Sequence, residues 1–317
     1  MPAAHRPHLS MSHPPLYHQH FGIRQPPFGI TPNPAFFYAG NTRGEILEAL
    51  VYAVLHGEGI IKVSGEVGSG KTMLCRMLER RLPDHVDVIY LANPTLARAD
   101  VPYAIAGELG LQVDGKRLDE VTRMLQADLI ARHANGRQVL LMIEEAQAMP
   151  LETLEEIRLF SNLETAHHKL LQIVLFGQPE LDAHLNLASM RQLKERITHS
   201  IVVPPMPLEV IPDFLAFRLH AAGYNGPALF SPAAVRQIAR VSEGIVRRIN
   251  ILADKSLMAA YADDADRVEA RHARAAIADC AFATHRADPA RTALLVGAGV
   301  GITALAVWLF MSTMASQ

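Results

Sequence analysis

The feature that most constrains this chain is a glycine-rich stretch, GEVGSGKT, at residues 65–72. An apolar run, IIKVS, comes directly before it, and a helix-forming run, TMLCRMLERR, begins at its last residue. Glycines allow successive backbone N–H groups to turn toward one anion, and the N-terminus of the following helix adds a favourable dipole. The pattern therefore predicts a phosphate-binding loop between a buried strand and a helix.

This loop predicts a nucleotide site with Mg²⁺. We expect Lys71 to reach the β- and γ-phosphates of ATP as a compact positive charge. We expect the hydroxyl group of Thr72 to coordinate Mg²⁺, a cation that prefers oxygen ligands. The predicted nucleotide-binding residues of the loop are Gly65, Glu66, Val67, Gly68, Ser69, Gly70, Lys71 and Thr72.

A second acidic motif lies about 70 residues further along the chain. The apolar run VLLMI at residues 139–143 ends in two carboxylates, Glu144 and Glu145. Successive side chains of a strand point to opposite faces, so the two carboxylates are expected to have different roles. We expect Glu144 to hold the metal or its waters and Glu145 to act as general base on, or to position, the attacking water.

Short apolar runs alternate with amphipathic stretches between residues 41 and 285, a pattern typical of an α/β protein with a parallel sheet. The runs show little alternation, which predicts strands that are buried on both faces. The predicted strands are Ile60–Ser64, Val86–Leu91, Gln138–Ile143, Leu171–Phe176 and Ile197–Val203. The predicted helices between them are Thr42–His56, Lys71–Arg81, Leu118–His133, Leu151–Glu164 and Ala188–Glu195.

The character of the chain changes near residue 207, after three closely spaced prolines. Only helical patterns follow, and Ser231-Pro232 supplies an N-cap and a first-turn proline for one of them. We therefore predict an α/β nucleotide-binding domain at residues 20–206 and a helical lid at residues 207–285.

The N-terminus and the overall composition exclude several classes of protein. Residues 1–19 are rich in His and Pro and are predicted to be disordered, because proline removes backbone donors and the histidines lack the spacing of metal ligands. Two cysteines cannot form a disulfide framework, which indicates a reducing compartment. A net charge of −2 argues against a surface devoted to nucleic acid.

The C-terminal stretch at residues 292–311, TALLVGAGVGITALAVWLFM, contains no charged residue. Twenty helical residues span about 30 Å, the thickness of the hydrocarbon core of a bilayer. Arg286 and Arg291 precede this stretch and no charge follows it, so the positive-inside rule places the folded body in the cytoplasm. We predict a single transmembrane helix in the inner (cytoplasmic) membrane.

Several longer motifs, in order and spacing, resemble the ExeA/GspA-type AAA+ ATPases, and within that family the MSHA-pilus biogenesis branch. The similarity covers roughly residues 18–280, and its motifs are GEGIIKVSGEVGSGKTMLCRML, IEEAQAMPLETLEEIRLFSNLET, LLQIVLFGQPEL, RQLKERI and GIVRRINILADKSLMAAY. The resemblance implies a P-loop AAA+ module with a five-stranded parallel sheet of order 5-1-4-3-2 and a C-terminal helical lid.

The resemblance also implies roles for residues outside the two motifs. Gln178 matches the sensor-1 position at the tip of the fourth strand, and Arg247 matches the sensor-2 arginine of the lid. Phe36 and Phe37, in an N-terminal arm similar to the family's, are expected to flank the adenine base.

One arginine is implied to act on a neighbouring subunit. Arg196 matches the arginine finger that completes a neighbour's site, and Arg191 is a weaker candidate for that role. An arginine supplied in trans makes hydrolysis depend on assembly, so a homo-oligomer is expected, with a ring as one form it can take.

The chain departs from the family pattern in three places. Glu144 stands where the family usually has Asp, which is expected to loosen the contact with Mg²⁺ and slow turnover. Val246 replaces a common Pro, and Arg248 follows, so either Arg247 or Arg248 could face the nucleotide. The peptidoglycan-binding region of larger family members is not transferred to this chain.

Together these features predict a membrane-anchored ATPase that supports assembly of a type IV (MSHA-like) pilus or a type II secretion apparatus. Its expected partners are copies of itself and inner-membrane assembly proteins of that apparatus. One alternative is a nucleotide-gated scaffold with little hydrolysis. Another is a DNA-linked ATPase that uses the basic stretch containing Arg236, Arg240 and Arg247-Arg248, although the net charge makes nucleic acid an improbable partner.

Overall fold

The computed structural model describes residues 17–56, 59–91, 93–164 and 168–284. Its centre is a parallel five-stranded sheet in the order β2-β3-β4-β1-β5, which is the predicted order 5-1-4-3-2 counted from the other edge. The predicted α/β P-loop fold is therefore confirmed. The strands are β1 (Ile60–Ser64), β2 (Val86–Leu91), β3 (Gln138–Ile143), β4 (Leu171–Gly177) and β5 (Ile197–Val202).

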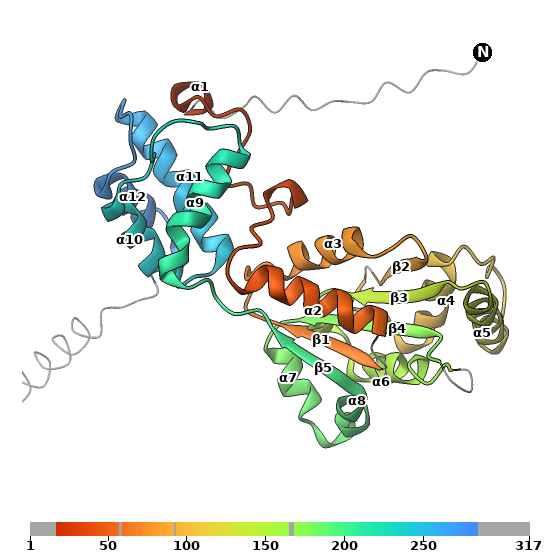
Figure 1. The fold of residues 1–317 in the computed structure, drawn as a ribbon. Coiled ribbons are helices and arrows are strands. Elements are labelled where there is room, and N and C mark those ends of the chain that lie inside the picture. The colour runs from red at the N-terminus through yellow and green to blue at the C-terminus, as the bar shows by residue number, and fades with distance from the viewer. Residues whose placement is uncertain (1–16, 57–58, 92, 165–167, 285–317) are drawn as a thin grey trace, which may run out of the picture.

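Helices cover both faces of the sheet and build a separate lid beyond it (Figure 1). Those of the α/β part are α2 (Thr42–His56), α3 (Lys71–Arg81), α4 (Val101–Glu108), α5 (Leu118–Ala134), α6 (Leu151–Phe160), α7 (Glu180–Leu185) and α8 (Arg191–Arg196). Those of the lid are α9 (Ile211–Ala221), α10 (Pro232–Ser242), α11 (Val246–Ala262), α12 (Ala270–Ala278) and α13 (Ala281–Thr284).

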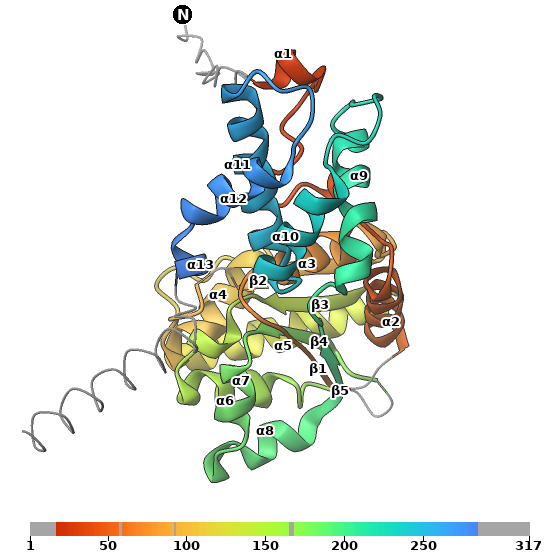
Figure 2. The ribbon, with the colours of Figure 1, turned by 90° about the vertical axis from the view of Figure 1, so that its left-hand side faces the viewer.

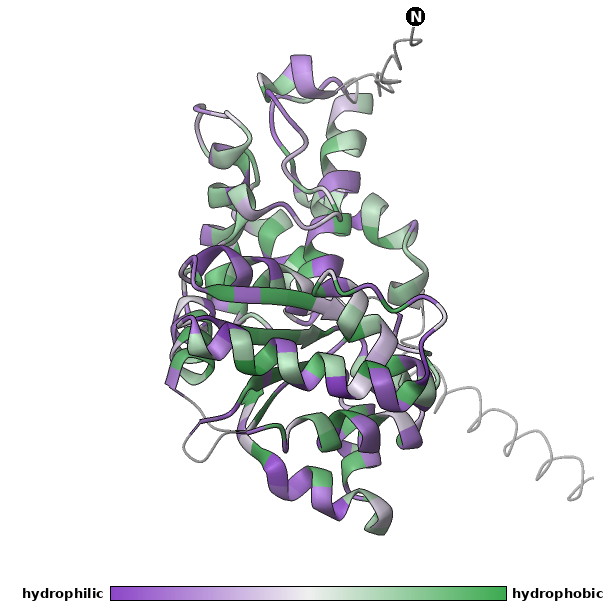
Figure 3. Ribbon diagram, turned by 90° about the vertical axis from the view of Figure 1, so that its right-hand side faces the viewer, coloured by the Kyte–Doolittle hydropathy of each residue, from purple (hydrophilic) through white to green (hydrophobic). Residues whose placement is uncertain are grey.

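The central strands are mostly apolar because both of their faces are buried; Lys62 and Ser64 of β1 and Gln172 of β4 are buried polar exceptions. Ile61 and Val63 of β1 pack in one cluster with residues of α2 and α3, whereas Ile60 packs in a second cluster with residues of α4 to α8. Figure 3 shows mostly hydrophobic colour along the inner strands. The chain runs from the carboxyl end of β1, at Ser64, directly into the glycine-rich loop.

Strand β5 and two helices differ from the sequence prediction. β5 alternates between half-buried and exposed residues and ends at Val202, because it is an edge strand with a neighbour on one side only. Helix α6 ends at Phe160, four residues earlier than predicted, and Ser161 caps it. The predicted helix Ala188–Glu195 is a short 3₁₀ turn at Ala188–Met190 followed by α8.

The N-terminal segment packs on the lid, which the sequence did not predict. Helix α1 (Tyr17–Phe21) begins inside the stretch that was expected to be disordered, and Tyr17 is only 1% exposed. The Tyr17 hydroxyl donates to Asp254 of α11. Phe28 and Phe36 extend this contact into the lid core, so the arm joins the lid and not the α/β domain to which it was assigned (Figure 2).

Two predictions fall outside the described residues: the disorder of residues 1–16 and the transmembrane helix at residues 292–311. Among the helices of the described ranges, none has both the length and the apolar composition that crossing a bilayer requires.

The carboxylate of Asp87 joins edge strand β2 to α5 and to the residue before β3, and it gives a first prediction. Asp87 accepts hydrogen bonds from Arg137 and Arg132, each with an N–O distance of 2.9 Å. Hydrogen bonding from Arg137, aided by Arg132, lowers the pKa of Asp87 to about 2. Because the folded pKa lies below the unfolded one, this stabilisation is complete above pH about 4 and is lost as the pH falls toward 2.

We expect Asp87→Asn to lower the free energy of unfolding at pH 7 by about 1–2 kcal/mol, since Asp87 is partly solvated. The difference from wild type should shrink as the pH falls toward 2. Urea unfolding at several pH values measures this, and Asp114→Asn, a change at an exposed carboxylate, is the control. A deficit that stays constant with pH would show that the charge of Asp87 is not the cause.

Candidate nucleotide-binding site

The loop between β1 and α3 has the backbone geometry that an anion site needs. Gly68 and Gly70 have positive φ angles of 81° and 105°, a region that side-chain-bearing residues rarely adopt. Gly70 caps the N-terminus of α3, so the first free N–H groups of that helix face the loop. The Gly65 N–H donates to the Gly177 carbonyl (3.2 Å), which ties the loop to the end of β4.

Lys71 is the first residue of α3 and is only 7% exposed. Its Nζ atom donates to the carbonyls of Gly65 (2.7 Å) and Glu66 (3.0 Å), so the ammonium lies within the curve of the loop. Burial lowers the pKa of Lys71, although the carboxylates of Glu145 and Glu66 oppose this shift. The loop thus concentrates positive charge and N–H donors at one point.

The two carboxylates after β3 point into different hollows. Glu145 has a φ angle of 53°, in the left-handed region, and lines the same cavity as Lys71 and Thr72. Glu144 lines a separate hollow with Arg76. Burial is the main cause that raises the pKa of the Cys75 thiol, and the negative charge of Glu144 raises it further. The two glutamates are therefore separated in space, in line with the expectation that they have different roles.

Two glutamines hold the Glu145 carboxylate. Gln147 Nε2 donates to Glu145 Oε2 at 2.6 Å, and Gln178 Nε2 donates to the same oxygen at 2.9 Å. The Gln178 backbone N–H in turn donates to Gln147 Oε1 at 2.9 Å, which closes a ring of three residues. Burial alone would raise the pKa of Glu145, but these hydrogen bonds, with Lys71 and Arg247, lower it.

Gln147 was not among the residues predicted from the sequence. It follows Glu145 by two positions, in the short 3₁₀ turn Ala146–Ala148 between β3 and α6. A polar side chain so close to a predicted general base was a usable signal. What the sequence could not show is that this turn brings Gln147 against the end of β4, where Gln178 lies.

The lid contacts the loop directly through Arg247. The Arg247 N–H donates to the Gly68 carbonyl (3.0 Å), and a Cβ atom added to Gly68 would lie 2.6 Å from the Arg247 Cβ. Arg247 also lines the cavity of Lys71. Arg248 pairs with Glu243 at 2.7 Å and lies over the ring of Phe282, so of the two arginines it is Arg247 that lies at the loop.

The far end of the cavity is aromatic, and its volume is about 350 Å³. Phe36 and Phe37 both line it, and their contact with an adenine base stays a prediction. Arg218 of α9 lies 4.8 Å from the Phe36 ring and donates to the Pro27 carbonyl. Burial lowers the pKa of Arg218 to about 10. The contacts of Arg218 with Pro27 and Phe36 join the lid to the N-terminal arm at this end of the cavity.

Two further buried polar residues line the cavity without having been predicted. Arg43 of α2 donates to the Ser69 carbonyl (3.1 Å) and the Pro204 carbonyl (3.4 Å), and so joins the loop to the linker before the lid. Asn250 of α11 is 5% exposed, and its Oδ1 has no partner among the described residues. Both come from segments far from the loop in sequence, so no local pattern could identify them.

Residues 54–185 match a family model described as an AAA domain, which includes the glycine-rich loop, both glutamates and Gln178. Residues 54–185 are thus similar to an AAA domain. Solved structures support the same fold: the Aeropyrum pernix ORC2 protein, in ADPNP–ADP complexes, superimposes with a TM-score of 0.59. It is 17% identical, and the match covers 78% of this chain and 72% of that one.

Curated relatives extend the similarity beyond the AAA domain. General secretion pathway protein A of Aeromonas hydrophila is 38% identical over 254 residues, which are 80% of this chain and 46% of that protein. The Mu-like prophage FluMu DNA transposition protein B of Haemophilus influenzae is 31% identical over 128 residues, covering 40% of this chain and 41% of that protein. The chain thus spans about half the length of these relatives. The MSHA-pilus branch stays a prediction.

Arg196 lies far from the glycine-rich loop of its own chain. Arg196 precedes the amino end of β5, and its carbonyl lies beside Gly59 at the amino end of the parallel strand β1. The glycine-rich loop follows the other end of β1, about 17 Å away for a strand of this length. Arg191 pairs with Glu195 at 2.9 Å on the same helix. Neither arginine reaches the nucleotide cavity of its own chain.

The donors near the loop fit Mg²⁺. Thr72 lines the cavity with Glu145, and Glu144 follows the carboxyl end of β3, which β4 separates from β1. Within the described residues no group of three or more His, Cys, Asp or Glu side chains could hold a metal alone. A hydroxyl and one or two carboxylates match the way Mg²⁺ binds, because this ion keeps several waters and takes other ligands from phosphates.

Proposed function

We propose that the AAA domain binds ATP with Mg²⁺ and hydrolyses it to ADP and phosphate. One observation carries the proposal: the carboxylate of Glu145, held ionised by two amide donors, lies in the same cavity as Lys71, Thr72 and Arg247. A fixed base beside a ring of phosphate-binding groups is the arrangement that phosphoryl transfer to water requires.

In this mechanism each group has one task. The loop amides and Lys71 neutralise the β- and γ-phosphates, and Glu145 accepts the proton of the attacking water. Gln178 lies beside Glu145, where its amide would contact the γ-phosphate and report its presence. Arg247 would place the lid against the same phosphate. Mg²⁺, held by Thr72 and Glu144 directly or through water, would offset charge on the phosphate oxygens.

We propose that hydrolysis requires assembly. Arg196 lies outside its own cavity, so it would serve the site of a neighbouring copy, as an arginine supplied in trans does. The rate per molecule should then rise with protein concentration until the homo-oligomer is complete.

The cellular role that the comparisons favour is support of a secretion or pilus apparatus. The 38% identity to general secretion pathway protein A covers 80% of this chain. We propose that the chain assists type II secretion or type IV pilus assembly, with its body in the cytoplasm and residues 292–311 as a single anchor in the inner membrane.

A nucleotide-gated scaffold is the second candidate, because Glu144 lines the hollow of Arg76 and not the cavity of Lys71. If that carboxylate does not support the metal, ATP would bind and be hydrolysed slowly. The DNA-linked alternative is less favoured. Arg247 lies at the loop whereas Arg236 and Arg240 line a hollow on the lid, so the basic stretch is not one surface.

The test is a steady-state ATPase assay of the full-length protein with and without Mg²⁺, over a range of protein concentrations. We expect Mg²⁺-dependent turnover whose specific rate rises with concentration. Tight ATP binding with turnover near zero would select the scaffold, and absence of both would refute the proposal. Membrane fractionation of the full chain and of a chain ending at residue 291 tests the anchor separately.

Gln147 gives a third test of the mechanism. Replacing it with Ala removes one donor to the Glu145 carboxylate, so the pKa of Glu145 should rise and the acid limb of the kcat profile should move to higher pH. We expect kcat to fall about tenfold or more, with KM nearly unchanged. The control is Gln126→Ala on the exposed face of α5. A lower kcat with an unmoved acid limb would mean that Gln147 does not act through Glu145.

A further inference from the structure

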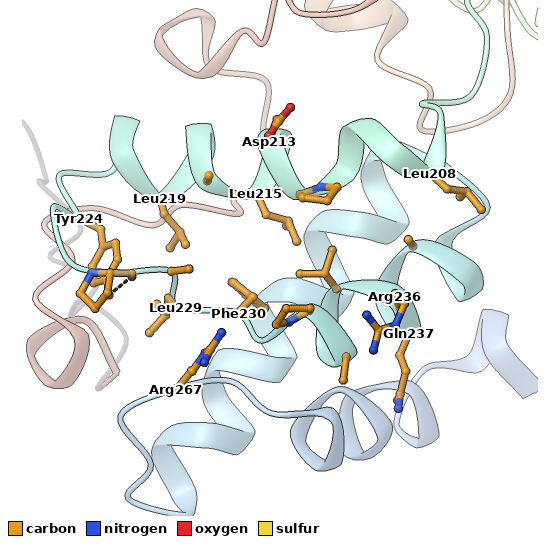
Figure 4. Close-up of a pocket in the computed structure, with 18 of the residues that line it drawn as sticks. Leu208, Asp213, Leu215, Leu219, Tyr224, Leu229, Phe230, Arg236, Gln237 and Arg267 are labelled. Atoms are coloured by element: carbon orange, nitrogen blue, oxygen red, sulfur yellow. Dashed lines mark hydrogen bonds between the residues drawn. The ribbon is translucent and has the colours of Figure 1, made fainter.

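The lid carries a large hollow that the nucleotide site does not use. It lies between α9 and the segment 224–241, and its volume is about 1800 Å³. Figure 4 shows Leu215 and Leu219 of α9 facing Leu229 and Phe230 across it. Pockets for small ligands usually measure about 300–1,000 Å³, so this hollow is larger than a small molecule needs. Its size and apolar floor suit a helix laid into a groove.

Four arginines surround one side of this hollow. Arg236 and Arg240 are one turn apart on α10, Arg267 precedes α12, and Arg274 lies on α12. All four are exposed, and none has an ion-pair or hydrogen-bond partner among the residues that the structure describes. Of the other lid arginines, Arg218, Arg248 and Arg271 are bonded, and Arg247 lies at the nucleotide cavity. The four arginines at the hollow are therefore not committed to another contact among the described residues.

Unpaired cations beside an apolar floor define the chemistry of the occupant. An amphipathic helix would place its apolar stripe on the leucines, and acidic residues beside that stripe would face the arginines. Residues 292–311 of this chain do not fit, because the flanking Arg286 and Arg291 would be repelled. We propose that the hollow binds an acidic amphipathic helix of a partner protein.

Phosphate-rich surfaces fit the hollow less well. The floor of the hollow is apolar, and it gives no contact to phosphate groups. A planar membrane cannot follow a concave surface, whereas a helix about 10–12 Å wide can enter it. Duplex DNA and anionic vesicles are therefore competitors in the test.

The experiment uses the full-length protein without nucleotide and a fluorescent synthetic helix of about 18 residues. The probe has Leu at positions spaced by three and four and Glu beside them, and a matched peptide has Gln in place of every Glu. Fluorescence anisotropy should show that the Glu peptide binds about tenfold more tightly than the Gln peptide at about 0.05 M salt. The difference should largely vanish at about 1 M salt.

Variants locate the binding. Arg236→Glu with Arg240→Glu should weaken the Glu peptide about tenfold or more and leave the Gln peptide unchanged. Arg117→Glu with Arg123→Glu, the same charge change on exposed residues of the α5 region, should have no effect. Ala216→Trp, which adds a ring at an exposed lining position of α9, should weaken both peptides. Circular dichroism confirms that each variant is folded.

Three results would overturn the proposal. If wild type and the Arg236→Glu, Arg240→Glu variant bound the Glu peptide equally well, these arginines would not pair with the acidic residues of the helix. If neither peptide bound at concentrations up to about 1 mM, the hollow would not be a binding site for a helix. If duplex DNA or phosphatidylglycerol vesicles displaced the peptide from wild type, and the Arg236→Glu, Arg240→Glu variant no longer bound these competitors, the arginines would be phosphate-binding residues. Because no nucleotide is present, none of these results depends on ATP hydrolysis.

Discussion

Replacing Glu145 with Gln should reduce steady-state ATP turnover about 10²–10⁴-fold while leaving nucleotide binding nearly intact. The amide has nearly the same shape as the carboxylate but cannot accept the proton of the attacking water. Lys71, Thr72 and the loop amides, which would hold the nucleotide, are unchanged. The measurements are phosphate release for turnover and calorimetric titration with a non-hydrolysable ATP analogue for binding.

The matched control is Glu144→Gln at the neighbouring position. Glu144 lines a different hollow and is proposed to act on Mg²⁺, so its loss should raise the Mg²⁺ concentration needed for half-maximal rate. Increasing Mg²⁺ should partly rescue Glu144→Gln and should not rescue Glu145→Gln. If Glu145→Gln were as active as wild type, the assignment of Glu145 as base would be wrong.

Replacing Lys71 with Gln should weaken ATP binding about 100-fold, because one buried positive charge no longer faces the phosphates. The same change should not destabilise the protein. Burial lowers the pKa of Lys71, which means that the folded state disfavours the charged form, so removing the charge should keep or raise the melting temperature at neutral pH. Lost binding together with retained stability is the expected combination.

Calorimetric titration and thermal unfolding of the same protein samples test this combination. The control is Lys116→Gln, at a partly exposed lysine paired with Glu120 in the helix that follows. A Lys71→Gln protein that binds ATP as wild type does would show that the loop does not hold the phosphates. A protein that unfolds at a much lower temperature would show that Lys71 supports the loop and that the loss of binding is indirect.

The α/β body was predictable because its signals are local. Each central strand is a short apolar run, and β1, β2 and β3 begin and end at the predicted residues. The prediction failed at β5, where edge position allows exposed residues, and at Tyr17, which looked like part of a polar tail. Neither an edge nor a distant partner such as Asp254 leaves a mark in the local pattern.

The site was only partly predictable for the same reason. Lys71 follows from the loop motif, and Glu145 and Gln178 follow from their places just after strand ends, since parallel strands bring their carboxyl ends to one edge. Gln147 and Arg43 become part of the site through hydrogen bonds with Gln178 and Ser69, which lie 31 and 26 positions away in the sequence. Such contacts depend on how elements pack, which periodicity does not encode.

By itself the sequence determined the phosphate loop, the parallel sheet and the change to a helical lid, because glycine geometry and apolar periodicity act over a few neighbouring residues. Only the tertiary structure decided that Glu145 and not Glu144 shares the cavity of Lys71, and that Arg247 and not Arg248 contacts Gly68. It also decided which arginines gather around the apolar hollow of the lid. Neighbouring side chains differ little in sequence but point in different directions, and packing against distant elements selects the direction.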